Sequence, residues 1–442
     1  MSEKIMLIRI ISILGHCLKV AGLSGLTKLR ELLPSREQTA DPLLTRSLVS
    51  ICERCGGAFP KVGQILSTRA DLLPPAWCVG LTALQDDMAP LSESEILGAL
   101  EDNHLTSSFL FFDPKAVASA TIAQVHRAIR LDDQREVAVK IMRPGVRRKL
   151  EQDCAIALFF GKYLARFPKL RSVPVIEAIA DTNQILLAQT DFVREAAKLK
   201  RLANLFRDNE SVIVPALHPD LCSEGILCMD YVSGMKKLTD KQLSDRKAKE
   251  AITGGLRALY KMIFVDGLVH CDLHPGNIMV APDDRVVILD AGFMVELDDA
   301  TRRSFAEFFW AIAFADGSTV ARIVRETATR LPDGLNEAEF DRDISELIGR
   351  VGGLRARDFQ VGSFVGDLFA IQHKHGIYGT SRFTLIILSL LVYEGVAKDR
   401  FPDLDFQKEA VPFVLAALAA KPSPPAEHTE GTALAAFALS RP

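Results

Sequence analysis

The stretch His270–Asn277 constrains the fold of this chain most, because it places an acidic and an amide side chain at a fixed spacing in a loop with Pro and Gly. It reads His-Cys-Asp-Leu-His-Pro-Gly-Asn, with Asp272 five residues before Asn277. The apolar run Val286–Leu289 comes after it and ends at Asp290. This order predicts a loop, a strand and a metal-binding carboxylate, the arrangement that phosphoryl transfer needs.

The charge of a triphosphate explains why these residue types suit such a site. Divalent metal must offset that charge before a nucleophile can approach. We predict that Asn277 and Asp290 bind Mg²⁺ and that Asp272 orients a hydroxyl or a water and accepts its proton. Taken alone, the same residues also suit a tight loop with a capping aspartate.

Length and composition set the class of protein. The 442 residues exceed one ordinary core, which favours two lobes or a domain with a large extension. With 48% hydrophobic and 25% charged residues, the chain is expected to be globular. A net charge of -3 argues against a nucleic-acid partner.

The eight cysteines are scattered, and no secretory signal is evident, a pattern typical of reduced thiols in the cytosol. Cys52 and Cys55 form a C-x-x-C pair. A metal or redox role for this pair competes with the simpler interpretation of buried helix cysteines.

Three apolar segments bear on membrane attachment. Lys4–Leu26 is interrupted by charged residues and predicts an amphipathic helix, which either lies on a membrane surface or packs on the protein's own helices. Phe383–Tyr393 and Val411–Ala420 are too short to span a bilayer and predict buried helices.

The first 110 residues have helical patterns over Ser47–Cys55 and Ile65–Leu73, with Pro74 and Pro75 expected to end the second helix. Lys61 and Gln64 flank a glycine where that second helix should start. A capped helix with a solvated lysine is the alternative to a functional role for them.

Next comes Ala116–Ala128, which predicts a turn of small residues leading into an alternating strand. Small side chains let a backbone approach a phosphate closely. The strand Val137–Ile141 then places Lys140 among β-branched residues, where an ammonium is costly to bury unless it is paired. The alternative is an edge lysine whose ammonium reaches solvent.

A carboxylate partner for this lysine is expected downstream. The segment Asp181–Leu205 predicts one long helix, with Asp191 and Glu195 four residues apart on one face. We predict that Glu195 pairs with Lys140, although either acidic residue could also be solvated in so charged a helix.

The second half of the chain reads as a strand over Ile226–Val232, placed to run beside an adenine, and then helices. The first helix covers 246–266 and ends at the glycine cap Gly267. The others are expected over 301–315, 319–330, 337–350, 361–373, 382–397 and 407–420. The tail after Lys421 is rich in Pro, Ser and Ala, so disorder is expected there.

Taken in order, these motifs resemble the UbiB family of atypical kinase-like proteins, over residues 40 to 405. The resemblance rests on Lys61-Val62-Gly63-Gln64, Ala118–Thr121, Val137–Lys140, Asp191 with Glu195, His270–Asn277 and Asp290-Ala291-Gly292. It implies an α+β, two-lobed protein-kinase-like fold with an N-terminal helical extension and a helix-rich C-terminal lobe. The implied boundaries are 1–105 for the extension, 106–234 for the N-lobe, 235–420 for the C-lobe and 421–442 for the tail.

The resemblance also implies a set of site residues. The catalytic set is Asp272, Lys140, Lys61 and Gln64; the nucleotide-binding set is Ala118, Ser119, Ala120, Thr121, Lys140, Glu195, Met229 and Tyr231; the metal ligands are Asn277 and Asp290. The implied cofactors are ATP and Mg²⁺. Lys61 and Gln64 are expected to lie over the site where a protein substrate would otherwise enter.

Three departures from the family pattern stand out. Gln189 replaces a glutamate expected to pair with Lys61, with Asp191 as the candidate substitute. Ala291 replaces the usual phenylalanine. The C-terminal membrane-spanning segments of some members are not evident, so we expect a cytoplasmic protein that is peripheral to the inner membrane.

The function implied is an ATPase of atypical kinase type that supports ubiquinone or other isoprenoid-lipid metabolism. The implied partners are an isoprenoid lipid or quinone precursor, a membrane surface and quinone-biosynthesis proteins, with no nucleic acid. The alternatives are a nucleotide-sensing pseudoenzyme that scaffolds a membrane enzyme complex, and a small-molecule kinase.

Overall fold

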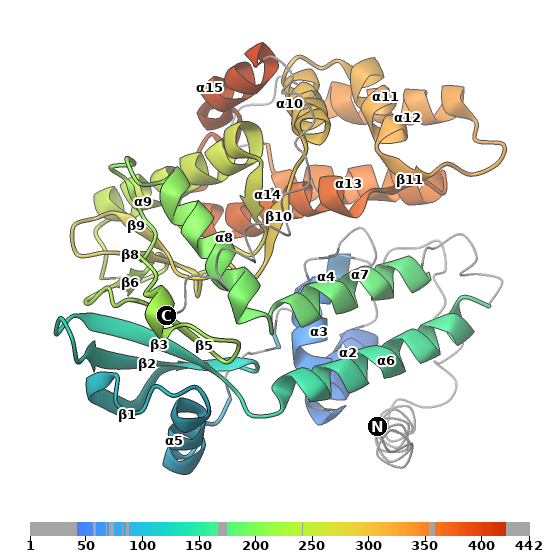
Figure 1. The fold of residues 1–442 in the computed structure, drawn as a ribbon. Helices are drawn as coiled ribbons and strands as arrows, with labels where there is room; N and C mark the ends of the chain where they lie inside the picture. Colours follow the sequence, from blue (N-terminus) through green and yellow to red (C-terminus); the bar gives the residue numbers. More distant parts are fainter. Residues whose placement is uncertain are drawn as a thin grey trace. The chain divides into compact units, whose positions relative to one another are not determined.

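The computed structural model describes residues 42–55, 59–67, 69, 75–81, 83–84, 88–166, 175–240, 242–352 and 359–420. The predictions for Lys4–Leu26, for Pro74 and for the tail after Lys421 fall outside these residues. The chain forms two compact units, one of residues up to 132 with 139–190, and one of 133–138 with residues from 191 onward. The fold is α+β with a helix-rich C-terminal part, as predicted (Figure 1).

The first unit begins with helices and continues into strands. Its elements are α2 (Pro42–Cys55), α3 (Phe59–Ser67), α4 (Pro75–Leu81), α5 (Glu93–Asp102), β1 (Phe109–Ser119), β2 (Ala123–Arg130), β3 (Glu136–Met142), α6 (Val146–Leu164) and α7 (Val175–Ala188). The strands β1 and β2 pair antiparallel in a sheet of order β1-β2-β3-β5. Strand β3 belongs to both units, because the division falls between Ala138 and Val139.

The second unit carries short strands and most of the long helices. Its elements before the helical part are α8 (Phe192–Leu205), β4 (Val212–Ile213), η3 (Pro219–Leu221), β5 (Ile226–Asp230), β6 (Lys236–Lys237), α9 (Asp245–Tyr260), the π-helical turn η4 (Lys261–Asp266), β7 (Leu268–His270), β8 (Ile278–Val280), β9 (Val286–Ile288) and β10 (Met294–Glu296). The helical part comprises α10 (Asp299–Ala313), α11 (Gly317–Glu326), α12 (Glu337–Val351), α13 (Val361–Lys374), α14 (Ser381–Lys398) and α15 (Phe406–Ala419), with β11 (Ala328–Arg330) and β12 (Tyr378–Gly379) between them. Helix α12 packs on α11 and on α13 (Figure 1).

The prediction of one helix over Asp181–Leu205 is wrong, because the helix breaks at residues 189–191. The Thr190 hydroxyl donates to the carbonyl of Leu187 at 2.7 Å, and Asp191 accepts from the amide of Arg194 at 3.0 Å as the N-cap of α8. These local bonds satisfy backbone carbonyl and amide groups at two helix ends, which a continuous helix would not have. Asp191 is therefore a cap outside the helix and not a residue of its exposed face.

Three other boundaries differ from the prediction. Ala116–Ser119 belongs to β1, and the turn is confined to residues 120–122. The helix expected over 319–330 ends at Glu326, because Ala328–Arg330 pairs with Tyr378–Gly379 as a strand. The helix expected to start near Ile65 begins at Phe59 and ends at Ser67.

Aromatic side chains fill the core of the second unit. The hydroxyl of Tyr393 donates to the carbonyl of Ile252 at 2.7 Å, and that of Tyr260 donates to the carbonyl of Phe406 at 2.8 Å. These bonds connect α9 to α14 and α15 while satisfying two fully buried hydroxyls. The prediction that Phe383–Tyr393 is a core helix is confirmed. In the described part of the chain, no helix is both long enough and apolar enough to cross a bilayer.

A glycine cap leads from the helices into the loop that begins at His270. Gly267 has φ 70° and its amide donates to the carbonyl of Met262 at 2.9 Å, which ends η4. A Cβ there would lie 2.9 Å from the Leu297 carbonyl oxygen. Only glycine meets both demands, so the predicted cap is confirmed and β7 starts directly after it.

Two adjacent glycines of α9 offer a test of the packing between α9 and α14. A Cβ on Gly255 would lie 2.2 Å from the Tyr393 hydroxyl oxygen, whereas one on Gly254 meets nothing closer than 3.7 Å. Gly255→Ala should lower the free energy of unfolding by about 1–3 kcal/mol through overpacking. Gly254→Ala should change it little or raise it by up to about 1 kcal/mol through helix propensity. Urea unfolding of both variants measures the difference, and equal effects would contradict this packing.

Candidate functional site

The buried ring of His270 connects the two segments that the sequence singles out. Its Nε2 donates to the carbonyl of Asp290 at 2.7 Å, and its Nδ1 accepts from the amide of Asp272 at 3.1 Å. These two bonds require the neutral ring with its proton on Nε2. Burial lowers the pKa of His270 below its ordinary value, although the nearby Asp290 and Asp272 oppose the shift. The ring therefore holds the backbones of both aspartates at one place.

Asn277 is held against the same loop. Its side-chain nitrogen donates to the carbonyl of Asp272 at 3.0 Å, and its backbone carbonyl accepts from the amide of Leu289 at 3.0 Å. Because the nitrogen is engaged, the side-chain oxygen is the group that Asn277 can offer to a cation. This orientation suits the role predicted for it.

Asp290 and Glu195 both approach Gly292. The Asp290 carboxylate accepts from the Gly292 amide at 2.6 Å. A Cβ on Gly292 would lie 3.0 Å from that carboxylate and 3.7 Å from Oε2 of Glu195. The absence of a side chain at Gly292 thus lets two carboxylates come close. Asp290 and the side-chain oxygen of Asn277, the two groups predicted to bind Mg²⁺, are oxygen ligands of the kind that Mg²⁺ prefers.

Helix α8 is fixed to β10 in the same unit. The Lys198 ammonium donates to the carbonyl of Met294 at 3.1 Å, and Arg201 pairs with Glu296. Burial lowers the pKa of Lys198, with Glu296 opposing the shift. This attachment holds Glu195, which is 2% exposed, beside Gly292.

Asp272 has one neighbour that the sequence interpretation overlooked. The ring of His274 lies 3.7 Å from its carboxylate, and Nδ1 of that ring accepts from the Gly276 amide at 2.9 Å. The Asp272 side chain is 25% exposed, so its carboxylate can be reached from solvent. The adjacent Cys271 is buried, which raises the pKa of its thiol to about 12 and keeps it protonated.

The alanine-rich turn of the first unit is held by residues that the sequence interpretation also overlooked. Arg143 donates to the Ala120 carbonyl at 2.7 Å, to the Ser119 hydroxyl at 2.7 Å and to the Ala89 carbonyl at 2.8 Å. A further bond runs from the Arg143 amide to the Ile122 carbonyl at 2.9 Å. One guanidinium therefore connects the turn to Ala89, which precedes α5.

Gln124 forms a second connection of the same kind. Its side-chain oxygen accepts from the Leu91 amide at 2.7 Å, and its nitrogen donates to Nε2 of His126 at 2.7 Å. Nδ1 of His126 in turn donates to the Asp113 carbonyl at 2.8 Å. Gln124 and His126 are both fully buried, so this network fixes the first residues after the turn.

The remaining predicted residues lie in several elements. Lys140 is half-buried in β3, where the side chains of Val139 and Ile141 on either side are fully buried. Because Lys140 belongs to the first unit and Glu195 to the second, their pairing stays a prediction. Met229 is buried in β5, and the Tyr231 amide after it donates to the Glu136 carbonyl at 3.1 Å.

The Lys-x-Gly-Gln motif lies on α3. Gln64 donates to the Leu84 carbonyl at 3.1 Å, and a Cβ on Gly63 would lie 2.2 Å from Cδ1 of Leu84. The motif thus packs closely on residue 84 of its own unit. Its expected place over a nucleotide stays a prediction.

On the neighbouring helix α2, burial raises the pKa of the Cys52 thiol to about 12. This shift disfavours the thiolate that metal binding or redox chemistry requires.

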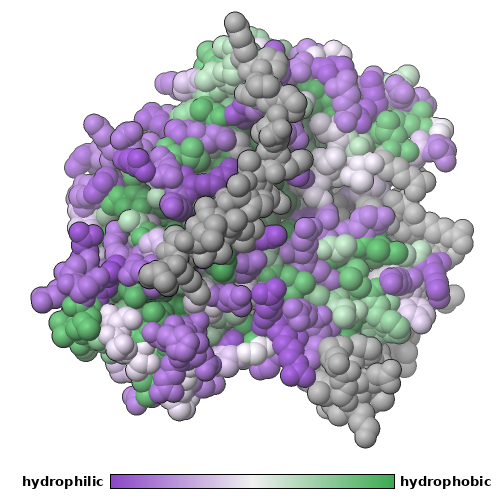
Figure 2. Space-filling view, in the orientation of Figure 1, coloured by the Kyte–Doolittle hydropathy of each residue, from purple (hydrophilic) through white to green (hydrophobic). Residues whose placement is uncertain are grey.

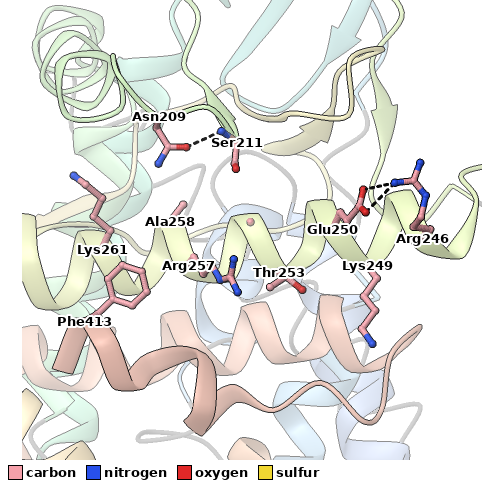
Figure 3. Close-up of a pocket in the computed structure, with 11 residues that line it drawn as sticks. Asn209, Ser211, Arg246, Lys249, Glu250, Thr253, Arg257, Ala258, Lys261 and Phe413 are labelled. Carbon is pink, nitrogen blue, oxygen red and sulfur yellow. Dashed lines mark hydrogen bonds and ion pairs between the residues drawn. The ribbon is translucent and has the colours of Figure 1, made fainter. Parts of the chain in front are cut away.

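A cavity of about 630 Å³ in the second unit lies on α9, away from the predicted set of residues (Figure 3). Three of its four basic side chains have acidic partners, since Arg246 pairs with Glu250, Arg257 with Glu409 and Lys261 with Asp266, and the fourth is Lys249. This balance of charge makes the cavity a poor candidate for phosphate.

Three residues whose side chains could bind a metal ion lie close together at α12 and the end of α13. They are Glu339, Asp343 and His375. Lys374 pairs with Asp343 at 2.6 Å and with Glu339 at 3.2 Å, so the protein's own ammonium already neutralises these carboxylates. This ion-pair cluster connects the two helices.

Comparison with known proteins identifies a family for most of this region. Residues 83–324, more than half of the chain, match the family model described as the ABC1 atypical kinase-like domain. A solved structure, the Rv3197–erythromycin complex from Mycobacterium tuberculosis, is similar at 20% identity and a TM-score of 0.45. That similarity covers 87% of this chain and 97% of the other.

The lowered pKa of His270 predicts that the folded protein loses stability in acid. The unfolded chain takes up a proton on this residue below its ordinary pKa of 6.5, whereas the folded protein resists it. The free energy of unfolding should be highest above that pH and fall by up to about 2 kcal/mol by pH 5 from this residue. His270→Asn should flatten the slope, and the exposed His104→Asn should not. Urea unfolding across this pH range measures both slopes, and an unchanged slope in His270→Asn would refute the assignment.

Proposed function

Because the chain belongs to the ABC1 atypical kinase-like family, we propose that it binds ATP with Mg²⁺ and hydrolyses it. The observation that carries this proposal is the bridge made by His270, which holds the backbones of Asp272 and Asp290 together in one unit. A capping aspartate in a simple tight loop would need no such buried connection to the backbone of a second aspartate.

Three residues of the second unit, Asp290, Asn277 and Asp272, have roles in this proposal. Asp290 and the side-chain oxygen of Asn277 would hold Mg²⁺, which supplies charge neutralisation of the phosphates. Asp272 orients the attacking water and accepts its proton. The ring of His274 lies 3.7 Å from the Asp272 carboxylate, on the exposed side of the loop.

Residues of the first unit complete the proposed site. Residues 118–121, at the end of β1 and the start of the turn, approach the phosphates with small side chains. Lys140 contacts the phosphates and is held by Glu195. The rigid support of the turn by Arg143 and Gln124 favours this role, because a loop that binds phosphate works best when it is already ordered. From the second unit, Met229 and Tyr231 are proposed to lie beside the adenine.

The biological setting proposed is ubiquinone or other isoprenoid-lipid metabolism at a membrane surface, with a quinone precursor or quinone-biosynthesis proteins as partners. It rests on the resemblance of the motifs to the UbiB family. Mass spectrometry of lipids in a deletion strain tests it. Unchanged quinone and isoprenoid levels would reject this setting while leaving the nucleotide site intact.

Binding of nucleotide should depend on the metal ligands. ATP at about a hundredfold excess over Kd should stabilise the protein by about 2.7 kcal/mol when Mg²⁺ is present. Asp290→Asn should remove most of this effect, because it loses a charged metal ligand. The exposed Asp283→Asn serves as a matched control, since that carboxylate pairs with Arg285. Melting temperatures with and without chelator measure the effect, and an equal ATP shift in chelator would exclude the metal assignment.

The motif on α3 should decide the phosphoryl acceptor. If Lys61 and Gln64 restrict the site to water or a small acceptor, the protein should release phosphate from ATP without phosphorylating generic proteins. Lys61→Ala should raise protein phosphorylation relative to phosphate release. Radiolabelled ATP follows both products at once. Robust transfer to a generic protein by the unaltered chain, with no change in Lys61→Ala, would contradict the proposed restriction.

A further inference from the structure

His274 is a partly exposed side chain of the His270–Asn277 loop, and the proposed function gives it no role. Leu273 is buried and anchors the loop in the core, so the side chains of Asp272 and His274 on either side of it both project outward. Hydrophobic and hydrophilic residues are interspersed over the described surface in Figure 2, so exposure alone does not mark a functional side chain. The contacts of the His274 ring carry the argument instead.

Gly276 holds this ring in place. Nδ1 of His274 accepts from the Gly276 amide at 2.9 Å. A Cβ on Gly276 would lie 2.5 Å from Cε1 of the ring and 2.9 Å from Nδ1, so the ring lies this close only because residue 276 has no side chain. Pro275 favours an extended backbone at His274, which further limits where the ring can lie. The position of the ring is therefore built into the loop.

The bond to Gly276 also decides which nitrogen of the ring carries the proton. A ring nitrogen that accepts a hydrogen bond has no proton of its own, so the proton of His274 is on Nε2. Nε2 is the nitrogen that lies 3.7 Å from Oδ2 of Asp272. The loop thus places an N–H donor beside that carboxylate. The distance exceeds that of a hydrogen bond, and such distances at catalytic groups often shorten once substrate is bound.

The Asp272 carboxylate lacks the support that its backbone has. The Asp272 amide donates to His270, and its carbonyl accepts from Asn277. Among the residues that the structure describes, no hydrogen bond holds the carboxylate itself. A carboxylate that orients a water acts faster when one of its oxygens is fixed and the other faces that water.

We propose that His274 is a positioning residue for the hydrolysis of ATP. With nucleotide bound, its Nε2–H donates to one oxygen of the Asp272 carboxylate and leaves the other oxygen to the attacking water. The water oxygen forms a bond to the γ-phosphorus, the bond from that phosphorus to ADP breaks, and the water's proton passes to Asp272, while His274 keeps its own proton. This inference rests on the proposed function and adds to it the group that orients the base.

Two substitutions of His274 separate positioning from a purely structural bond to Gly276. His274→Asn keeps an acceptor near the place of Nδ1 and loses the donor near Nε2, whereas His274→Gln keeps the donor and loses the acceptor. His274→Asn should lower kcat for phosphate release by up to about 100-fold, the cost of a misplaced reacting group, with little change in KM for ATP. His274→Gln should keep most of the rate. His104→Asn, at an exposed residue before β1, should leave kcat unchanged.

Gly276→Ala tests the same ring without replacing it. Gly276 does not have a positive φ, so alanine fits the backbone and only the ring must move. Gly276→Ala should lower kcat, and its combination with His274→Asn should lose no more than His274→Asn alone, because both changes remove one interaction. Gly366→Ala, where a Cβ meets nothing within 4 Å, is the matched control and should leave kcat unchanged.

Nitrogen NMR of a chain with labelled histidine follows the ring without turnover. The His274 signals, identified by their loss in His274→Asn, should show the proton on Nε2 in the free protein. A nonhydrolysable ATP analogue with Mg²⁺ should shift the Nε2 signal, and Asp272→Ala should abolish that shift. A proton on Nδ1, or a shift of equal size in Asp272→Ala, would overturn the positioning role, the latter because the ring would then contact the nucleotide.

The kinetic outcomes keep this inference apart from the proposed function. If the unaltered chain releases phosphate and His274→Asn matches its rate, the inference fails and the proposed function stands. Loss of activity in His274→Gln with full activity in His274→Asn would make the ring a structural cap of Gly276. A fall in melting temperature that accompanies the loss in His274→Asn would also reject positioning. No phosphate release by the unaltered chain would reject the proposed function and this inference with it.

Discussion

The hydrogen bonds of His270 are the interaction on which the rest of the proposed site depends. The ring is fully buried, and each of its nitrogens is used, one by the backbone of Asp272 and one by the backbone of Asp290. Removing one partner would leave a buried polar group unsatisfied, which costs about 1–3 kcal/mol. The ring thus makes the two functional loops one structural unit. It does so without offering a group to a ligand, because neither nitrogen is free.

The alanine-rich turn is also held by side chains that are not themselves predicted to bind the ligand. Arg143 and Gln124 use their donors and acceptors on backbone groups of the turn and of residues 89–91. Glycine loops are flexible, whereas alanine limits the backbone and needs its conformation to be held. The structure therefore supports the turn with charged and amide side chains. Through the same side chains, direct bonds join residues 89–91 to the turn.

Sequence patterns pointed to the candidate site residues but not to the residues that support them. Asp272, Asn277 and Asp290 could be proposed because phosphate chemistry limits the residue types and their spacing, and the structure brings their loops together through His270 and the Asn277 side chain. Arg143 could not be found in this way. Most of its partners are carbonyl oxygens, which every residue has, so no sequence pattern marks them.

The amino-acid sequence by itself determined the local elements whose signals are short in range. The strand around Lys140 and the glycine cap at Gly267 depend on alternating side chains and on backbone freedom, and both appear as predicted. Tertiary structure alone decided where α11 ends and which buried groups join the loops. The end of α11 depends on β12, which lies about fifty residues further along the chain. Helical periodicity carries no information on such distant partners, because a backbone hydrogen bond between strands requires only that the two segments meet.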